Sequence, residues 1–373
     1  MYIDTDNAVY DIDFSQVQIE ITGICNMNCR HCRDSFDKKA DMPLEEIEKI
    51  LKFATKNGSE ILEVVLSGGE PLLHKGFEHI LWLLDKYEIK KLYITTNGSM
   101  PVQPYLPIFK KMQTMVSVSL DSIIPNEHDS FRNYTGAYDK AIETINLLRD
   151  NEIKASIRAS LLPENINQIP EIAEHAYGLG VTRLAISSIL PIGNALDDSS
   201  MFMTQDLKKD FLLRLFTLRE KYLPLGMKIT TNDPLQNICR YKEVECHEQF
   251  VDEIVVAEHC RDCYNLDVCF PKKEEGVTLI EGCTGGVTSF NVFANGDLTP
   301  CAILNMQVLN VFETPVEELE ELYVSNEIVK NLVGRAFSGK CGTCALKFVC
   351  GGCRARAKNT YNDYLAEDPD CWK

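Results

Sequence analysis

Up to about residue 222, the chain alternates between two patterns of apolar positions. In short segments such as residues 17–21 and 62–66, apolar residues alternate with polar ones or stand together, as in buried strands. In longer segments such as residues 43–54, apolar residues recur three and four positions apart, as on one face of a helix. The patterns predict strands at residues 17–21, 62–66, 92–95, 116–120, 155–160 and 184–189, and helices at residues 43–54, 77–87, 141–148, 169–177 and 207–222.

Strands separated by helices predict an α/β fold with a parallel sheet, because each helix returns the chain to the side where the preceding strand began. Six such units are too few to close an eight-unit TIM barrel. The alternation stops after residue 222. We therefore predict a barrel-type domain at residues 1–222, a cysteine-containing linker or insert at 223–282, and a small cysteine-organised domain at 283–373.

Composition and charge exclude several classes of protein. The net charge of −17 argues against a nucleic-acid partner, whose phosphates need a basic surface. The sequence has no run of 18 or more apolar residues, which predicts no membrane span. Its first residues lack the basic and apolar regions of a secretory signal, so we expect a cytoplasmic protein. In that compartment, 15 cysteines are more readily explained as metal ligands than as disulfides.

The first cysteines form a compact motif. Cys25, Cys29 and Cys32 have C-x3-C-x2-C spacing and follow the first predicted strand. Thiolates are the usual ligands of iron–sulfur clusters, and a cluster usually has four of them. Three cysteines on so short a loop leave one iron open to a ligand that is not protein. The alternative is a zinc knuckle, in which His31 supplies the fourth ligand.

Polar and glycine-rich groups follow the later strands. Ser-Gly-Gly-Glu-Pro occupies residues 67–71 after the second strand, and Thr-Thr-Asn-Gly occupies 95–98 after the third. Ser-Leu-Asp-Ser at 119–122 and His-Asp-Ser-Phe-Arg at 128–132 follow the fourth, and Leu-Pro-Ile-Gly at 190–193 follows the sixth. In barrels of parallel strands, functional groups gather at the C-terminal strand ends. We therefore expect these groups to share one site with the cysteine motif.

The cysteine motif and the strand-end groups together resemble the radical S-adenosylmethionine (SAM) superfamily. The resemblance implies an open partial (β/α)6 TIM barrel, a 4Fe–4S cluster on the three cysteines, SAM on the open iron, and a flavodoxin- or ferredoxin-type reductant. It also implies reductive cleavage of SAM to a 5′-deoxyadenosyl radical. Glu70 and its glycines are expected at the SAM amino group, and Arg132 at its carboxylate. The implied SAM-binding residues are Gly68, Gly69, Glu70, Thr96, Asn97, Ser119, Asp121, Arg132 and Leu190.

A second set of cysteines organises the C-terminal part. Cys283 precedes Gly296 and Cys301 with C-x12-G-x4-C spacing, and Asn295-Gly296 predicts a hairpin with a type I′ turn. The pattern resembles the SPASM domain, which carries auxiliary 4Fe–4S clusters, although two residues rather than three separate Cys350 from Cys353. The resemblance assigns Cys341, Cys344, Cys350 and Cys371 to a distal cluster, and Cys283, Cys301 and Cys353 to a proximal cluster.

Five of the 15 cysteines lie outside these sets of three and seven. Cys269 is the nearest one upstream of Cys283, and it is a candidate fourth ligand of the proximal cluster. Without it, the proximal cluster keeps an open iron. The other four suffice for a further cluster or a structural zinc, whereas the alternative is that they are buried, unligated thiols. These four are Cys239, Cys246, Cys260 and Cys263.

The resemblance implies radical oxidation or cross-linking of a ribosomally made peptide, with the auxiliary clusters accepting an electron. Few residues precede the first strand, so we expect a separate leader-binding protein or direct docking. A tetrapyrrole is the alternative substrate, with Arg132, Arg158 and Arg183 as candidate basic residues. Sulfatase maturation is disfavoured because Ala302 stands where those enzymes carry an acidic general base. The non-enzymatic alternative is an iron–sulfur carrier. A carrier does not need to bind SAM, so the residues at the strand ends that resemble a SAM site argue against it.

Overall fold

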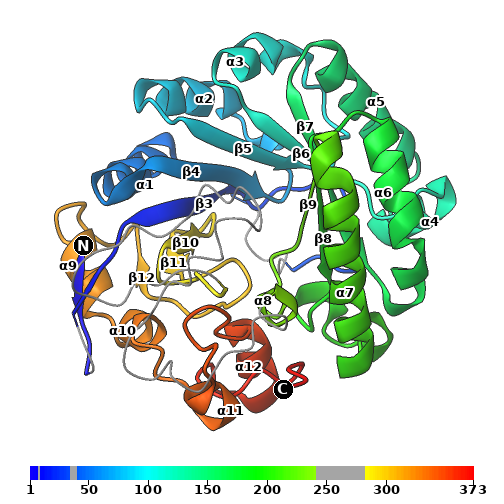
Figure 1. Cartoon of the computed structure of the whole chain (residues 1–373). Helices are drawn as coiled ribbons and strands as arrows, with labels where there is room; N and C mark the ends of the chain where they lie inside the picture. Colours follow the sequence, from blue (N-terminus) through cyan, green and yellow to red (C-terminus); the bar gives the residue numbers. More distant parts are fainter. Residues whose placement is uncertain (7–8, 34–39, 241–281) are drawn as a thin grey trace.

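The computed structural model describes residues 1–6, 9–33, 40–240 and 282–373 (Figure 1). Its centre is a sheet of ten strands in the order β12-β11-β10-β3-β4-β5-β6-β7-β8-β9. All six predicted strands are present, and each pairs in parallel with the next. They are β3 (Phe14–Thr22), β4 (Gly58–Gly68), β5 (Lys91–Thr96), β6 (Met115–Ser119), β7 (Lys154–Leu161) and β8 (Arg183–Ser188).

Helices cover the outer face of these strands (Figure 1). Alternate strand residues such as Ile19, Val64 and Ile94 are fully buried, because the helices pack their apolar stripes against them. The five predicted helices are all present. The helices of the barrel are α1 (Leu44–Lys56), α2 (Phe77–Lys86), α3 (Leu106–Lys111), α4 (Pro125–Arg132), α5 (Ala137–Asp150), α6 (Ile169–Gly178) and α7 (Gln205–Tyr222).

Short 3-10 helices continue several of the strand-end loops. The first, η1, starts at Pro71 within the Gly-Gly-Glu-Pro run, and Glu70 accepts a hydrogen bond from Leu72 N at its start. The others lie between strands and the following helices, or close to helix ends. The six are η1 (Pro71–Leu73), η2 (Gln103–Tyr105), η3 (Pro163–Gln168), η4 (Gly193–Ala195), η5 (Ser199–Met201) and η6 (Leu223–Leu225).

The parallel sheet extends beyond the six predicted strands on both sides. At one edge, β9 (Lys228–Thr230) pairs in parallel with β8. At the other, β10 (Ser289–Val292) pairs in parallel with β3, so the C-terminal part continues the barrel sheet. Two antiparallel strands, β11 (Asp297–Thr299) and β12 (Leu309–Asn310), complete it. The predicted α/β partial barrel is confirmed, with these additional strands.

The predicted hairpin is formed by β10 and β11, but its turn differs from the prediction. Four residues connect the strands, and Gly296 N donates to Phe293 O at 2.8 Å. Gly296 has a φ of 88°, whereas Asn295 is not among the residues of positive φ. A type I′ turn needs positive φ at both central residues, so the longer connection replaces it.

Aromatic side chains join the first barrel strand to the C-terminal part. The ring of Phe14 on β3 lies 4.6 Å from Phe290 on β10 and 5.3 Å from Tyr323 on α9. An N-terminal hairpin of β1 (Tyr2–Asp4) and β2 (Val9–Asp11) lies beside α9 and α10. The C-terminal helices are α8 (Gln236–Arg240), α9 (Leu319–Ser325), α10 (Glu327–Val333), α11 (Gly339–Thr343) and α12 (Arg354–Tyr361).

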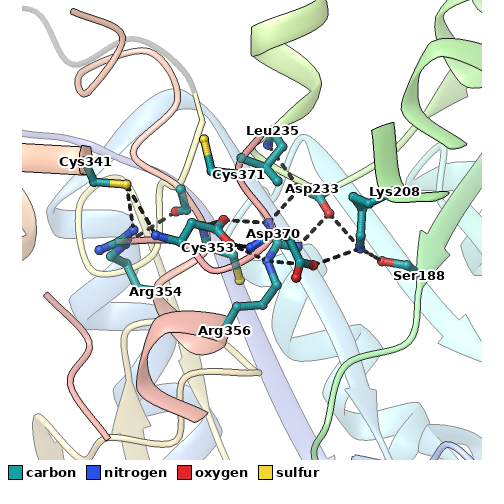
Figure 2. Close-up of polar contacts among 12 residues, drawn as sticks. Ser188, Lys208, Asp233, Leu235, Cys341, Cys353, Arg354, Arg356, Asp370 and Cys371 are labelled. Carbon is teal, nitrogen blue, oxygen red and sulfur yellow. Dashed lines mark hydrogen bonds and ion pairs between the residues drawn. The ribbon is translucent and has the colours of Figure 1, made fainter. Parts of the chain in front are cut away.

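A buried ion network forms a second junction between the barrel and the C-terminal part (Figure 2). Asp233, just after β9, accepts two hydrogen bonds from Arg356 on α12, at 2.7 and 3.0 Å. Lys208 on α7 lies 3.3 Å from Asp233 and 3.7 Å from Asp370. Arg356 also pairs with Asp368 at 2.7 Å. Because these charges are buried, their partners fix the end of the chain against the barrel.

Helices in the described ranges lack the combination of length and apolar character that bilayer crossing requires.

Candidate functional site

The three cysteines of the first motif lie together on the loop after β3. Cys29 and Met27 are buried against Ala137 of α5, and Cys25 and Cys32 pack against the same cluster. Burial raises the pKa of the Cys25 thiol to about 11, and the neighbouring thiols Cys29 and Cys32 add to the shift. Burial also raises the pKa of Cys29, and metal binding would compensate the charge of such buried thiolates. Their grouping on one short loop fits the predicted cluster.

His31 lies in the same loop, but its ring packs elsewhere. It stacks on Phe131 with ring centroids 4.3 Å apart and ring planes 3° apart. Burial lowers the pKa of His31 to about 3, so the ring is neutral at physiological pH. Within the described ranges, no three His, Cys, Asp or Glu side chains converge closely enough to share one metal ion. The stacking of His31 on Phe131 thus separates its ring from the thiols, and this lack of convergence in the described residues applies to the three cysteines as well as to a zinc knuckle.

The two glycines after β4 bring the next loop against the cysteine loop. A Cβ on Gly69 would lie 2.3 Å from Ile24 O, and a Cβ on Gly68 would lie 2.2 Å from Thr22 O. Gly68 also has a φ of 139°, which side chains disfavour. Glu70 N donates to Ile24 O at 2.8 Å, directly before Cys25. Only glycine permits this close approach.

Glu70 is fully buried and holds three loops together. Its Oε1 accepts from Thr96 Oγ1 at 2.8 Å and from Leu72 N at 3.3 Å, and its Oε2 accepts from Asn97 N at 2.8 Å. Asn97 Nδ2 in turn donates to Asn26 Oδ1 of the cysteine loop at 2.9 Å. Burial raises the pKa of the Glu70 carboxyl to about 7. The structure thus brings Glu70, Thr96 and Asn97 together as neighbours of the cysteines.

Asp121 and Arg132 form a buried pair beside the same cysteines. Arg132 Nε donates to Asp121 Oδ2 at 2.6 Å, and Arg132 Nη1 lies 3.8 Å from Cys29 Sγ. Although burial opposes its ionisation, the Arg132 guanidinium holds the pKa of Asp121 below its usual range. Asp121 Oδ1 accepts from Ser160 N at 2.8 Å. Ser119, at the end of β6, is buried opposite Arg158 on β7.

The loop after β8 contributes contacts that the sequence did not predict. Leu190 is half-buried there. Gly193 lies so close to the cysteine loop that a Cβ would be 2.2 Å from Cys32 O. Asn194 N donates to the same carbonyl at 2.8 Å, and Asn194 Nδ2 donates to Cys29 O at 2.9 Å. A lone asparagine after a glycine gives no sequence signal for such a role.

The four cysteines assigned to the distal cluster surround one cavity. Cys341 lies on α11, Cys344 at its end, Cys350 before α12, and Cys371 near the C-terminus. All four line the cavity, whose apolar walls include Leu235. Thiols placed around a space fit a cluster of several irons better than a single zinc ion. Burial raises the pKa of Cys350 to about 12.

The cysteines assigned to the proximal cluster also approach one another. Cys283 raises the pKa of the Cys301 thiol, which burial has already raised, and it does the same for Cys353. Cys283 N donates to Cys350 O at 3.0 Å, so the two sets adjoin. Cys239 lies on α8 and packs against the core. The candidate fourth ligand and three further cysteines lie outside the described residues: Cys269, Cys246, Cys260 and Cys263.

Arg33 links the first cysteine loop to the C-terminal part. Its Nη2 lies 2.6 Å from Glu20 Oε1 on β3, and its Nη1 donates to Ala302 O at 3.0 Å. Position 302 is therefore next to the site. Because it is alanine, it offers no carboxylate as a general base.

Comparisons with known proteins agree with this geometry. Residues 19–176 match the model of the radical SAM superfamily. An AdoMet-dependent heme synthase of Methanosarcina barkeri is 27% identical over 94% of each chain. The subtilosin biosynthesis protein AlbA of Bacillus subtilis is 23% identical, over 95% of this chain and 70% of AlbA. Streptococcus suis SuiB bound to S-adenosylmethionine has the same fold, with a TM-score of 0.70 and 17% identity over 97% of this chain and 78% of SuiB.

Residues 19–176 thus carry a radical SAM domain, and the structure forms it as a partial barrel. The resemblance inferred from the cysteine and strand-end motifs is confirmed. The relatives named above are enzymes, so the carrier hypothesis has no support from them.

Proposed function

We propose that the chain oxidises a carbon of a ribosomally made peptide. When bound to Cys25, Cys29 and Cys32, a 4Fe–4S cluster supplies the electron that cleaves SAM to a 5′-deoxyadenosyl radical, which takes a hydrogen atom from the substrate. The three thiols leave one iron position to SAM. Clusters on the C-terminal cysteines take the electron that the oxidation releases, and a flavodoxin- or ferredoxin-type protein reduces the first cluster.

The residues around the first cysteines have distinct parts in this proposal. The carbonyl oxygens of Gly68 and Gly69 accept hydrogen bonds from the SAM amino group, in a loop that its glycines allow to approach the cysteine loop closely. Arg132 receives the carboxylate through its terminal nitrogens, since Asp121 occupies its Nε. Glu70 orients the loops after β4 and β5 through its three hydrogen bonds. We assign Ser119 and Leu190, which lie at or just after the ends of β6 and β8, to the nucleoside part of SAM.

The lining of the barrel supports a peptide substrate. The strand face opposite the helices, here called the lumen, carries small polar and charged side chains. Gln18 donates to Ser67 across it, Arg183 donates to Thr230, and Glu20 pairs with Arg33. Hydrogen-bond donors and acceptors spread along this lining suit the amide groups of a polypeptide. This lining is the observation that carries the proposal.

Similar proteins support the same substrate class. AlbA takes part in making the bacteriocin subtilosin, and SuiB has also been solved with its precursor peptide SuiA. SuiB shares the fold over nearly the whole of this chain. A separate leader-binding protein or direct docking then presents the peptide.

Coexpression with any short reading frames found beside the gene, followed by mass spectrometry of the peptides, tests the proposal. A peptide that loses hydrogen atoms only with the intact enzyme, and not with the Cys29→Ala variant, supports it. Release of 5′-deoxyadenosine without change in any candidate peptide, together with turnover of an added tetrapyrrole, overturns the peptide assignment and leaves the radical SAM chemistry in place.

One lumen residue favours a tetrapyrrole as the second candidate substrate. Arg158 on β7 has an exposed side chain, and within the described residues its guanidinium has no hydrogen bond or carboxylate at salt-bridge distance. Its pKa is lowered to about 10, because surrounding protein displaces water from the guanidinium and because Arg33, Arg132 and Arg183 lie nearby. An unpaired guanidinium inside a barrel suits a carboxylate, such as a tetrapyrrole propionate. The heme synthase relative is consistent with it.

Binding of an iron porphyrin that carries propionates separates the two candidates. Loss of the charged hydrogen bond in Arg158→Gln should weaken porphyrin binding about tenfold. SAM binding by Arg158→Gln is measured as well. A loss of SAM affinity would mean that Arg158, and not only Arg132, binds the SAM carboxylate. Arg149→Gln, an exposed change on α5, is the control. Equal porphyrin binding by both variants excludes Arg158 as a propionate anchor.

A further inference from the structure

Arg335 is a buried cation without a counter-charge at hydrogen-bond distance. It lies between α10 and α11, and only 3% of its surface is exposed. In the part of the chain that the structure describes, its Nε and Nη1 atoms have no hydrogen-bond partner. Its φ is 53°, in the left-handed region that a side chain makes unfavourable. A buried, unpaired charge on a strained backbone is a costly arrangement that persists where something else requires it.

The side chains that favour the charged form of Arg335 include two cysteines. Burial lowers the pKa of Arg335, and Cys283 and Cys350 act in the opposite direction, as does Tyr10. Gly351, next to Cys350, has a φ of 70°, and a Cβ there would lie 2.8 Å from Arg335 Nη1. The glycine therefore makes room for the guanidinium beside the thiol. Within the described residues, Arg335 has no salt bridge to an aspartate or glutamate, and the nearby charge of Arg354 adds to the lowering of its pKa.

A second arginine stands close by and differs in its contacts. The guanidinium carbons of Arg335 and Arg354 lie 5.6 and 4.2 Å from the centroid of the same ring, Phe337. Arg354 donates to two backbone carbonyls at 3.1 and 2.6 Å, and its Nη2 lies 3.6 Å from Cys341 Sγ. Arg354 thus has its donors largely satisfied by protein. In contrast, Nε and Nη1 of Arg335 remain available to another hydrogen-bond acceptor.

The position of Arg335 is at the boundary of two thiol sets. Cys283 belongs to the proximal set and Cys350 to the distal set, and the backbone hydrogen bond between them measures 3.0 Å. The charge of one guanidinium therefore acts on both. Thiolate-bound iron–sulfur clusters are anionic, and hydrogen bonds and nearby charges set their potentials.

We propose that Arg335 is a positioning residue for electron transfer, whose buried charge and free N–H groups stabilise the reduced state of the clusters held by Cys283 and Cys350. The inference rests on the auxiliary clusters of the proposed function. Reduction adds one electron to a cluster and converts one ferric iron to ferrous. No proton has to enter, because Arg335 already carries the compensating charge. The electron comes from the oxidised substrate and leaves to an external carrier.

Potentiometric titration followed by electron paramagnetic resonance tests the proposal. The full chain is reconstituted with Cys25, Cys29 and Cys32 all replaced by alanine, so that only C-terminal clusters give a signal. At a fixed potential near the midpoint, Arg335→Gln should lower the ratio of reduced to oxidised cluster about tenfold, a shift of about 59 mV for a one-electron couple. Arg335→Lys, which keeps the charge, should recover most of it. Arg214→Gln, at an exposed ion pair, is the control.

Three results overturn different statements. Absence of iron from the triple-alanine parent overturns the auxiliary clusters themselves, and with them the proposed function. Full cluster content with an unchanged midpoint in Arg335→Gln overturns only the role of Arg335. If Arg335→Gln takes up no clusters, circular dichroism of the cluster-free chains decides. A folded variant means that the guanidinium was needed to compensate the clusters, whereas an unfolded one means that Arg335 is a structural residue and the proposal fails.

Discussion

At the scale of single residues, the thiol of Cys29 has no substitute in its loop. It is buried, and Arg132 reaches it at 3.8 Å. Cys29→Ala leaves two thiols, too few to retain a cluster with one open iron. We expect SAM cleavage to fall to background and the iron content to drop by about four per chain, while the absorption of the C-terminal clusters persists. Release of 5′-deoxyadenosine and iron analysis measure both effects.

The reciprocal variant is the control for this prediction. Cys371 lines the distal cavity, away from the first loop. Cys371→Ala should lower the C-terminal signal and keep cleavage of SAM to 5′-deoxyadenosine. Equal loss of all cluster signals in both variants would contradict separate sites.

Glu70 gives a pH-dependent prediction. Its carboxyl has a pKa raised from 4.5 to about 7 by burial, so between these values the folded protein holds a proton that the unfolded chain has lost. Stability contributed by this group is therefore full below about pH 4.5 and is lost as the pH rises through about 7, by up to about 3 kcal/mol.

Glu70→Gln removes this titration. The difference in thermal unfolding midpoint between the wild type and Glu70→Gln should change in favour of the variant from pH 5 to pH 8. Glu143→Gln, an exposed carboxyl on α5, should show a constant difference. A constant difference for Glu70→Gln as well is the result that contradicts the prediction.

Motif spacing predicted which strand-end residues lie near the first cysteines, and their roles toward SAM stay a prediction. Glu70 was expected at the SAM amino group, and in the structure its oxygens are occupied by Leu72, Thr96 and Asn97. Asn194 and Arg335 had no motif, because their surroundings depend on the fold: Asn194 donates to the cysteine loop, and Arg335 is buried with two nitrogens that lack a partner in the described residues. Single-residue identity carries no information about such long-range partners.

At the scale of elements, periodicity located the strands and helices that have a full repeat. The strand predicted at 184–189 is β8, and the helix predicted at 207–222 is α7. Strand β9 has three residues, too few for an alternating pattern to stand out. The pairing of β10 with β3 joins Ser289 to Gln16, and local sequence contains no signal for a contact so distant. The division at 222 and 282 stays a prediction.

Gly193, which begins η4, tests how tightly the loop after β8 holds the cysteine loop. It has a φ of 54°, and a Cβ would lie 2.2 Å from Cys32 O. Gly193→Ala must displace the cysteine loop, so we expect at least a tenfold loss in the rate of SAM cleavage. Gly178→Ala is the matched control, because a Cβ there meets nothing within 4 Å. Similar rates for the two variants would show that the loop adapts.

At the scale of the whole molecule, the ion network around Asp233 is expected to hold the barrel and the C-terminal part together. Asp233→Asn leaves Arg356 and Lys208 buried without one of their carboxylates. Loss of one partner from a buried pair costs about 3–5 kcal/mol, and we expect a decrease of that size in the free energy of unfolding. Denaturant unfolding of the reconstituted protein measures it.

An exposed pair provides the comparison. Asp210→Asn removes the partner of Arg214 on α7, where both side chains are substantially exposed. Such pairs contribute about 0.5 kcal/mol or less. If both variants lose the same small amount of stability, then the network around Asp233 does not hold the two parts together.

The parallel pairing of β3 with β10 also bears on how chains with this fold change during evolution. Strand β3 leads into the first cysteine loop, and β10 follows Cys283, so the backbone pairing of the two strands sets how far the first cysteines lie from the C-terminal ones. Chains that share this strand pairing can thus vary other loops and acquire new substrates without changing the distance between the two sets of cysteines.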